Sequence, residues 1–141
     1  MQFQQWETEQ DLSNEQDIAR LIEKKWECHT HKLPKHYRAD FELVRGGETI
    51  GFAEIKCRTI PHNRYRTLIL SLAKVAMTRL YAQTAGVPMY LVIRFTDGVY
   101  YTDLSSFQSF KTTHGGRTNK TRDSRDLEPV CNIPTSALIK L

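Results

Sequence analysis

The hydrophobic residues near the N-terminus recur at helical spacing. Ser13 stands where a helix N-cap is expected, and Gln16, three residues later, completes a capping-box pattern. Apolar side chains then fall on one helix face, at Ile18, Leu21, Ile22 and Trp26. The pattern predicts a first helix that begins after Ser13. Glu15 would lie on the buried side of its first turn, where an acid either complements the helix dipole or belongs to a site.

Two runs of β-prone residues, 39–45 and 49–58, flank the pair Gly46-Gly47. Glycine supplies the positive φ angles of a tight turn, so the two runs predict a β-hairpin. The segment before it, residues 27–38, is either an irregular strand or a loop.

A second helix is predicted from about Thr67 to Ala85, followed by a glycine suited to a C-cap and then by Pro88. Its apolar stripe consists of Leu68, Leu72, Val75, Ala76 and Leu80. Residues 88–95 are almost continuously apolar, which is typical of a strand covered on both faces. A turn at Asp97-Gly98 leads into another strand, residues 99–104.

The remaining chain is less regular. Residues 111–128 are polar, basic and long for a loop, so this segment is either functional or disordered. A short strand over 129–134 and a last helical turn within 135–141 complete the chain. The predicted order, α-β-β-β-α-β-β-β, defines an α/β fold with a central mixed sheet flanked by helices, and its core spans about residues 13–104.

Composition fits one globular domain over residues 1–141, since 40% of residues are hydrophobic and 26% are charged. The N-terminus lacks a signal-peptide pattern, and the longest apolar run, near residues 89–93, is too short to span a bilayer. Three cysteines without a pairing pattern fit reduced thiols. We therefore expect a cytoplasmic protein, in the host cell if it is viral. The net charge of +4 weakly favours an anionic partner, although a charge that serves solubility is as common.

The register of the hairpin decides which residues share a face of the sheet. In the second strand, Glu54 and Lys56 lie on one face, and the small or apolar residues between them lie on the other. A two-residue turn would place the apolar residues of the two strands on opposite faces of the sheet, whereas a three-residue connection over residues 46–48 places them on the same face. We therefore predict the three-residue connection, with a glycine bulge. The pairs that it predicts are Arg45 with Thr49, Leu43 with Gly51, Phe41 with Ala53, and Asp40 with Glu54.

Asp40 and Glu54 would then form a cross-strand pair with β-carbons about 5 Å apart. Two carboxylates this close repel, so one would tend to stay protonated unless a divalent cation binds them. Hard oxygen ligands suit Mg²⁺ or Mn²⁺. Lys56 could reach a water or a phosphate beside that metal, and an acid pair, a metal and an ammonium are the groups that phosphodiester hydrolysis needs. A solvated strand face with a stray ion pair also explains the Glu-x-Lys spacing.

Cys28, His29 and His31 form the other metal-like group in the sequence. Adjacent cysteine and histidine are poorly spaced for a tetrahedral zinc site, and no second ligand pair follows nearby. We therefore expect no zinc site in this segment.

The motif "RAD" at residues 38–40, "AEIKCR" with its glutamate fourteen residues after Asp40, a following helix and "PMYLVIRF" resemble the PD-(D/E)XK nuclease superfamily. The resemblance implies the restriction-endonuclease-like αβββαβ core, which the predicted order matches from about Ser13 to Phe95. Ala39, instead of proline, precedes Asp40, and this departure is common in the superfamily.

By this resemblance Asp40 and Glu54 are metal ligands, Ile55 offers its backbone carbonyl to the same metal, and Lys56 positions or activates the attacking water. Glu15 resembles the extra acid of the first helix in the resolvase-like and VRR-type branches. Lys74 resembles the polar residue that the second helix often directs at the site. A lysine that only faces solvent explains this position at least as well.

Basic residues flank the predicted site and suggest a DNA partner, because lysine and arginine contacts to phosphates give affinity without sequence reading. The candidates are Arg58, Arg64, Arg66, Arg117, Lys120 and Arg122. A soluble flexible loop explains the last three equally well, because nearby acids offset much of their charge.

Together these features predict a divalent-metal-dependent DNA endonuclease. By analogy with stand-alone phage and archaeal Holliday junction resolvases, it would be structure-selective and could form a homodimer. The alternatives are a non-catalytic nucleic-acid-binding domain of the same fold, and a sequence-specific restriction-type enzyme or an exonuclease.

Overall fold

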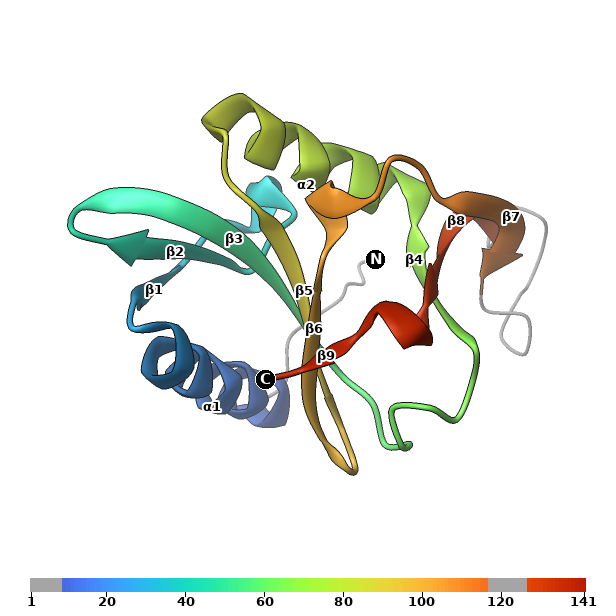
Figure 1. The fold of residues 1–141 in the computed structure, drawn as a ribbon, viewed down its shortest axis with the longest axis horizontal. Coiled ribbons are helices and arrows are strands. Elements are labelled where there is room, and N and C mark those ends of the chain that lie inside the picture. Colours follow the sequence, from blue (N-terminus) through green and yellow to red (C-terminus); the bar gives the residue numbers. More distant parts are fainter. Residues whose placement is uncertain (1–8, 117–126) are drawn as a thin grey trace.

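The computed structural model describes residues 9–116 and 127–141, and Figure 1 shows two helices on opposite sides of a twisted sheet. The N-terminal elements are α1 (Glu9–Trp26), β1 (His29–Lys32), the 3₁₀ turn η1 (Lys35–Tyr37), β2 (Phe41–Arg45) and β3 (Glu48–Cys57). The next are β4 (Thr67–Ser71), α2 (Leu72–Ala85), β5 (Met89–Phe95), β6 (Gly98–Asp103) and η2 (Leu104–Ser106). The last are β7 (Lys111–Gly116), β8 (Leu127–Pro134), η5 (Thr135–Ala137) and β9 (Ile139–Lys140).

The central sheet has six strands in the order β1-β2-β3-β5-β6-β9, and a smaller sheet has the order β4-β8-β7. Strands β3 and β5 are parallel and the other neighbours are antiparallel, so the predicted mixed sheet is confirmed. The chain crosses from β3 to β5 through β4 and α2, as parallel pairing requires. This crossover places α2 beside the strand that carries Glu54.

Both faces of the central sheet are covered, as the apolar run over β5 predicts. On one face Ile18 and Ile22 of α1 pack with Ala53, Ile55 and Val92. The opposite face packs against α2 and the smaller sheet, in a cluster that includes Phe52, Leu70, Val75, Leu91 and Ile93. The face of β3 that carries Glu54 is therefore a second core face and is not solvated.

The hairpin turn differs from the prediction. Arg45 pairs with Glu48 across a two-residue turn, in which Gly46 and Gly47 have φ angles of 60° and 79°. Two consecutive positive φ angles suit a two-residue turn, and successive glycines supply them without strain. The extra residue lies inside β3, because the register shifts between Leu43/Val44 and leaves Ile50 as a bulge. Beyond the bulge, the predicted pairs Leu43–Gly51 and Phe41–Ala53 are confirmed.

Both predicted helix starts are wrong. Helix α1 already includes Glu9, so Ser13 lies within it and is not its cap. Residues 67–71 form β4 because they pair along their whole length with β8, and α2 begins only at Leu72. The predicted end is confirmed, since Gly86 is left-handed with φ 69° and its N–H donates to Ala82 and Gln83.

The buried face of α2 is rotated from the predicted stripe. Val75, Thr78 and Ala82 are buried, whereas Leu72 and Leu80 are 39% and 53% exposed. Thr78 can be buried because its hydroxyl donates to the carbonyls of Lys74 and Val75 within the helix and so keeps a hydrogen-bond partner. The rotation turns Lys74 toward the central sheet.

The C-terminal part is more regular than predicted. Residues 111–116 of the predicted loop form β7, which pairs with β8. The predicted strand over 129–134 is confirmed within β8, and the predicted last turn is η5, after which β9 joins the edge of the central sheet. No helix among the described residues is long and apolar enough to cross a membrane.

Two leucine substitutions test which residues form the core. Leu91→Ala should lower the free energy of unfolding by about 2–5 kcal/mol, because it removes a fully buried side chain. The matched control Leu80→Ala removes a side chain that is 53% exposed and should change it by no more than about 0.5 kcal/mol. Urea titrations of the two variants measure both values. A loss for Leu80→Ala as large as the loss for Leu91→Ala would mean that Leu80 of the predicted α2 stripe is buried.

Candidate active site

Strand β3 carries the central acid of the candidate site. Glu54 points to the α2 side of the sheet and is only 3% exposed, although it is a carboxylate. Its neighbours on that side of the central sheet are Phe52 and Lys56 along β3 and Leu91 across on β5. A buried acid is destabilising unless partners compensate it, so its surroundings define the chemistry.

Asp40 lies just before β2, at the edge of β3. Its N–H donates to the carbonyl of Ala53 at 3.0 Å, although Ala53 is the partner of Phe41 in the hairpin. The predicted direct pair of Asp40 with Glu54 is therefore wrong, because the regular pairing ends at Phe41–Ala53. Because β2 begins at Phe41, the backbone of Ile55 has no β2 residue opposite it, and the Asp40 Oδ2 accepts the Ile55 N–H at 2.7 Å instead. The C=O of a strand residue points to the same side as its N–H. The Ile55 carbonyl is therefore directed to the edge where Asp40 lies.

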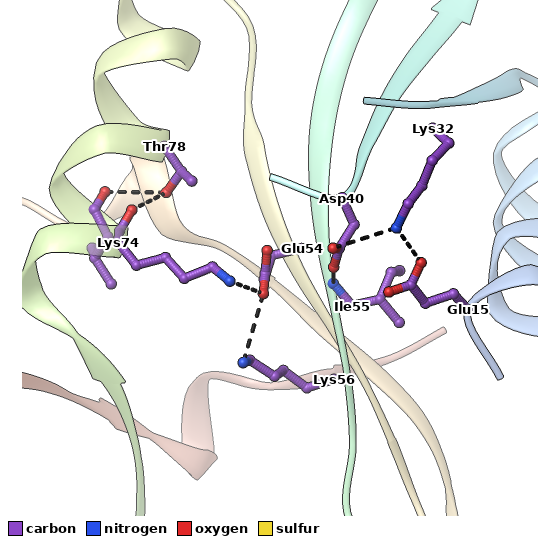
Figure 2. Close-up of polar contacts among 9 residues, drawn as sticks. Glu15, Lys32, Asp40, Glu54, Ile55, Lys56, Lys74 and Thr78 are labelled. Carbon is purple, nitrogen blue, oxygen red and sulfur yellow. Dashed lines mark hydrogen bonds and ion pairs between the residues drawn. The ribbon is translucent and has the colours of Figure 1, made fainter. Parts of the chain in front are cut away.

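Two lysines contact Glu54 from different elements (Figure 2). The Nζ of Lys74, from α2, lies 2.6 Å from Glu54 Oε2, and the Nζ of Lys56, from β3, lies 3.6 Å from the same oxygen. The predicted residues Asp40, Glu54, Ile55, Lys56 and Lys74 are thus brought together. Lys74 reaches the acid because Val75 and Thr78, next to it, pack on the core.

A third lysine was missed from the sequence. Lys32 of β1 lies with its Nζ 2.5 Å from Glu15 Oε1 and 3.9 Å from Asp40 Oδ1. Figure 2 shows it between the two acids. Its position follows from the pairing of Lys32 with Phe41, which the irregular composition of residues 27–38 did not reveal. The carboxylate of Glu15 thus contacts Lys32, and its predicted metal contact stays a prediction.

The electrostatics of the site are set by burial. Desolvation, followed by the repulsion of Asp40, raises the pKa of Glu54 to about 7, against the opposing attraction of Lys74 and Lys56. Desolvation also lowers the pKa of Lys56, and the pull of Glu54 opposes this shift only in part. The two lysines therefore do not fully neutralise the effect of burial on the acid.

The donor set fits a divalent cation. Within the described part of the chain, Glu54 Oε1 is buried and has no hydrogen-bond partner. An unpartnered buried oxygen is unfavourable, and a metal ion would satisfy it. Among the described residues no group of three His, Cys, Asp or Glu side chains could hold a metal. Two carboxylates and a backbone carbonyl, completed by water, suit Mg²⁺, which usually keeps several waters.

The predicted DNA-binding residues fall into two groups. Arg58, Arg64 and Arg66 are exposed on the connector between β3 and β4. This connector is held to the β5–β6 turn by His62, whose N–H and Nδ1 contact the Asp97 carboxylate at 2.9 and 2.6 Å. Arg117, Lys120 and Arg122 lie outside the described residues.

A mixed sheet between two helices, with an aspartate beside a buried Glu-x-Lys strand, defines the class of PD-(D/E)XK nucleases. The whole chain, residues 1–141, matches the family described as "Phage putative PDDEXK endonuclease". The chain belongs to this family, which indicates a nuclease.

Among solved structures, the 1.6 Å structure of Archaeoglobus fulgidus Hjc is similar to this chain. Hjc is a Holliday junction resolvase from an archaeal hyperthermophile. The TM-score is 0.59, the sequence identity is 14%, and the match covers 92% of each chain. This likeness confirms the predicted fold. No curated protein matches the sequence.

The raised pKa of Glu54 predicts a pH dependence of stability. Desolvation raises the pKa of this carboxyl from its ordinary value of 4.5 to about 7 in the folded protein. Between these values the folded state holds a proton that the unfolded state has released, so stability falls as the pH rises. From pH 5 to pH 8 without divalent metal, this group should lower the free energy of unfolding by up to about 3 kcal/mol.

Urea titrations of Glu54→Gln measure this contribution, because the amide does not titrate. Glu54→Gln should lose less stability than the wild type over the same pH range, whereas the exposed control Glu48→Gln should follow the wild type. Identical pH profiles for wild type and Glu54→Gln would show that Glu54 has an ordinary pKa.

Proposed function

We propose that this protein is a divalent-metal-dependent DNA endonuclease that prefers branched DNA. The observation that carries the proposal is the buried Glu54, which keeps one oxygen without a hydrogen-bond partner among the described residues, next to Asp40 and two lysines. A purely structural acid would be expected to have both oxygens satisfied. Membership of the phage endonuclease family supports the same chemistry.

Asp40, Glu54 and the Ile55 carbonyl would hold Mg²⁺ or Mn²⁺. Such an ion, when bound, supplies a water of lowered pKa and stabilises charge on the phosphate. Lys56 follows Glu54 on the same face, and its lowered pKa fits a group that positions or deprotonates the attacking water. Lys74 holds the Glu54 carboxylate from α2. Glu15 would orient Lys32 beside Asp40, and its direct contact with the metal stays a prediction.

Several features support DNA as the substrate. The chain carries a net charge of +4, and Arg58, Arg64 and Arg66 are exposed on the connector that follows Lys56. Arginines at such positions bind phosphates without reading sequence. The preference for branches is inferred from the fold of Hjc, which is a Holliday junction resolvase. A homodimer is proposed by the analogy with stand-alone resolvases made from the sequence, and a cytoplasmic location from the composition of the chain. We also propose that residues 1–141 act as one domain.

Substitution of the two proposed catalytic groups tests the nuclease activity. Asp40→Asn and Lys56→Ala should each lower the rate of DNA cleavage in Mg²⁺ by about 100-fold or more, because each removes a charge that the transition state needs. EDTA should abolish cleavage. The matched controls Asp17→Asn and Lys24→Ala change exposed residues of α1 and should keep the wild-type rate. A non-catalytic DNA-binding domain would instead bind DNA in all variants and show only an EDTA-insensitive background.

A substrate panel tests the preference for branches. With equal concentrations of four-way junction, linear duplex and supercoiled plasmid, the wild type should cleave the junction at least about tenfold faster than the linear duplex. Discrete cuts in linear duplex at one sequence, without preference for junctions, would instead identify a restriction-type enzyme. Release of mononucleotides from ends would identify an exonuclease.

A further inference from the structure

A cavity of about 360 Å³ lies beside the candidate active site, between the central sheet and the smaller sheet. This volume is in the range of pockets that bind small organic groups. Apolar side chains from both sheets and from the connector form its walls, namely Ile60, Leu68, Leu70, Leu91 and Ile93. Lys56 and Arg58 also line it, so part of its lining is cationic.

Lys56 joins this cavity to the active site. Its Nζ lies 3.6 Å from Glu54 Oε2, and its side chain also lines the cavity. Arg58 follows on the same strand face and is exposed. A phosphate held by these two cations would leave its attached nucleoside next to the apolar walls. The cavity thus suits a nucleotide, because its cations can bind the anionic phosphate and its apolar walls can contact the flat faces of the base.

Tyr65 provides an aromatic surface at this cavity. It lines the cavity although its side chain is 57% exposed, and the Arg64 guanidinium lies 5.7 Å from its ring centre. An exposed aromatic ring beside arginine is a stacking surface for bases in proteins that bind single-stranded nucleic acid. Because Tyr65 is so exposed, its replacement should not disturb the core.

Strand β4 can supply polar contacts at the same place. Among residues 9–116 and 127–141 it is an edge strand of the smaller sheet whose one partner is β8, so alternate backbone N–H and C=O groups point away from β8. Residues 67–70 of β4 line the cavity, and Figure 1 shows β4 on the side of the smaller sheet toward the central sheet. Backbone donors and acceptors there could bond to the edge of a base.

We propose that this cavity receives one unstacked nucleobase of the DNA strand being cut, from a nucleotide next to the cleaved phosphate. The inference rests on the proposed nuclease function and adds a reason for selectivity. Removing a base from the stack is least unfavourable where pairing is already interrupted, at branches, mismatches and single-stranded segments. The protein would therefore favour such DNA through this cavity, without reading its sequence.

The test combines removal of the base with removal of the ring. Wild-type protein first cleaves a junction in Mg²⁺, and the position of the cut is mapped. Binding is then measured in the Asp40→Asn background with intact DNA and with DNA that has an abasic nucleotide on either side of the cut. The proteins compared carry Tyr65, Tyr65→Phe or Tyr65→Ala, with Tyr37→Ala as a matched control. Tyr37 is 38% exposed and does not line the cavity.

With Tyr65 or Phe at this position, loss of the base on one side of the cut should weaken binding by about tenfold. With Tyr65→Ala the same loss should be less than about twofold, because the two changes remove one contact. Tyr37→Ala should retain the tenfold effect. Arg58→Ala should reduce the slope of log affinity against log salt by about one, whereas Tyr65→Ala should leave the slope unchanged.

Equal effects of base removal in the Tyr65 and Tyr65→Ala proteins would overturn the proposal while leaving the nuclease function intact. A change from dimer to monomer in Tyr65→Ala, without coupling to the base, would also overturn it and would identify the cavity as an interface between copies. Absence of cleavage in the first step would overturn the proposed function, and this inference with it.

Discussion

The structure depends on the burial of one carboxylate between a sheet and a helix. Glu54 is 3% exposed on a strand whose two faces are both core, and desolvation raises its pKa to about 7. Glu54 is fixed in the core by its neighbours on β3, because Ala53 and Ile55 pack on α1 while Phe52 packs on the α2 side. The acid therefore cannot turn to solvent without removing its neighbours from the core. Its charge has to be compensated where it lies.

The rest of the site follows from this compensation. The β2–β3 hairpin pairs only as far as Phe41, and the carboxylate of Asp40, which precedes it, accepts the Ile55 N–H at the strand edge. Helix α2 turns Lys74 inward to 2.6 Å from Glu54, and Lys56 approaches the same oxygen. Both lysines contact Oε2, while Oε1 has no hydrogen-bond partner within the described residues. This asymmetry leaves Glu54 Oε1 as an acid oxygen that a cation can bind.

Much of the site could be predicted because strand alternation and pairing are strongly constrained. The pairs Phe41–Ala53 and Leu43–Gly51 followed from matching two apolar faces, although the sequence did not reveal that a bulge at Ile50, and not the turn, absorbs the mismatch. The contact of Lys74 with Glu54 could not be derived from the apolar periodicity of α2. The pattern places Leu80 on the buried face of the helix, but Leu80 is exposed, and Thr78, whose hydroxyl bonds within the helix, is buried instead. Strand β4 was hidden for a similar reason, since its pairing with β8 spans some 60 residues of chain. Local patterns do not encode such distant contacts.

The most direct test of the proposed metal site is the position of Mn²⁺ in crystals of the protein, measured by anomalous diffraction. We expect a peak bound by the carboxylates of Asp40 and Glu54 and by the carbonyl of Ile55, with Glu54 Oε1 among the ligands. A peak at other residues, or no peak at saturating Mn²⁺ while both lysines stay on Glu54, would contradict it.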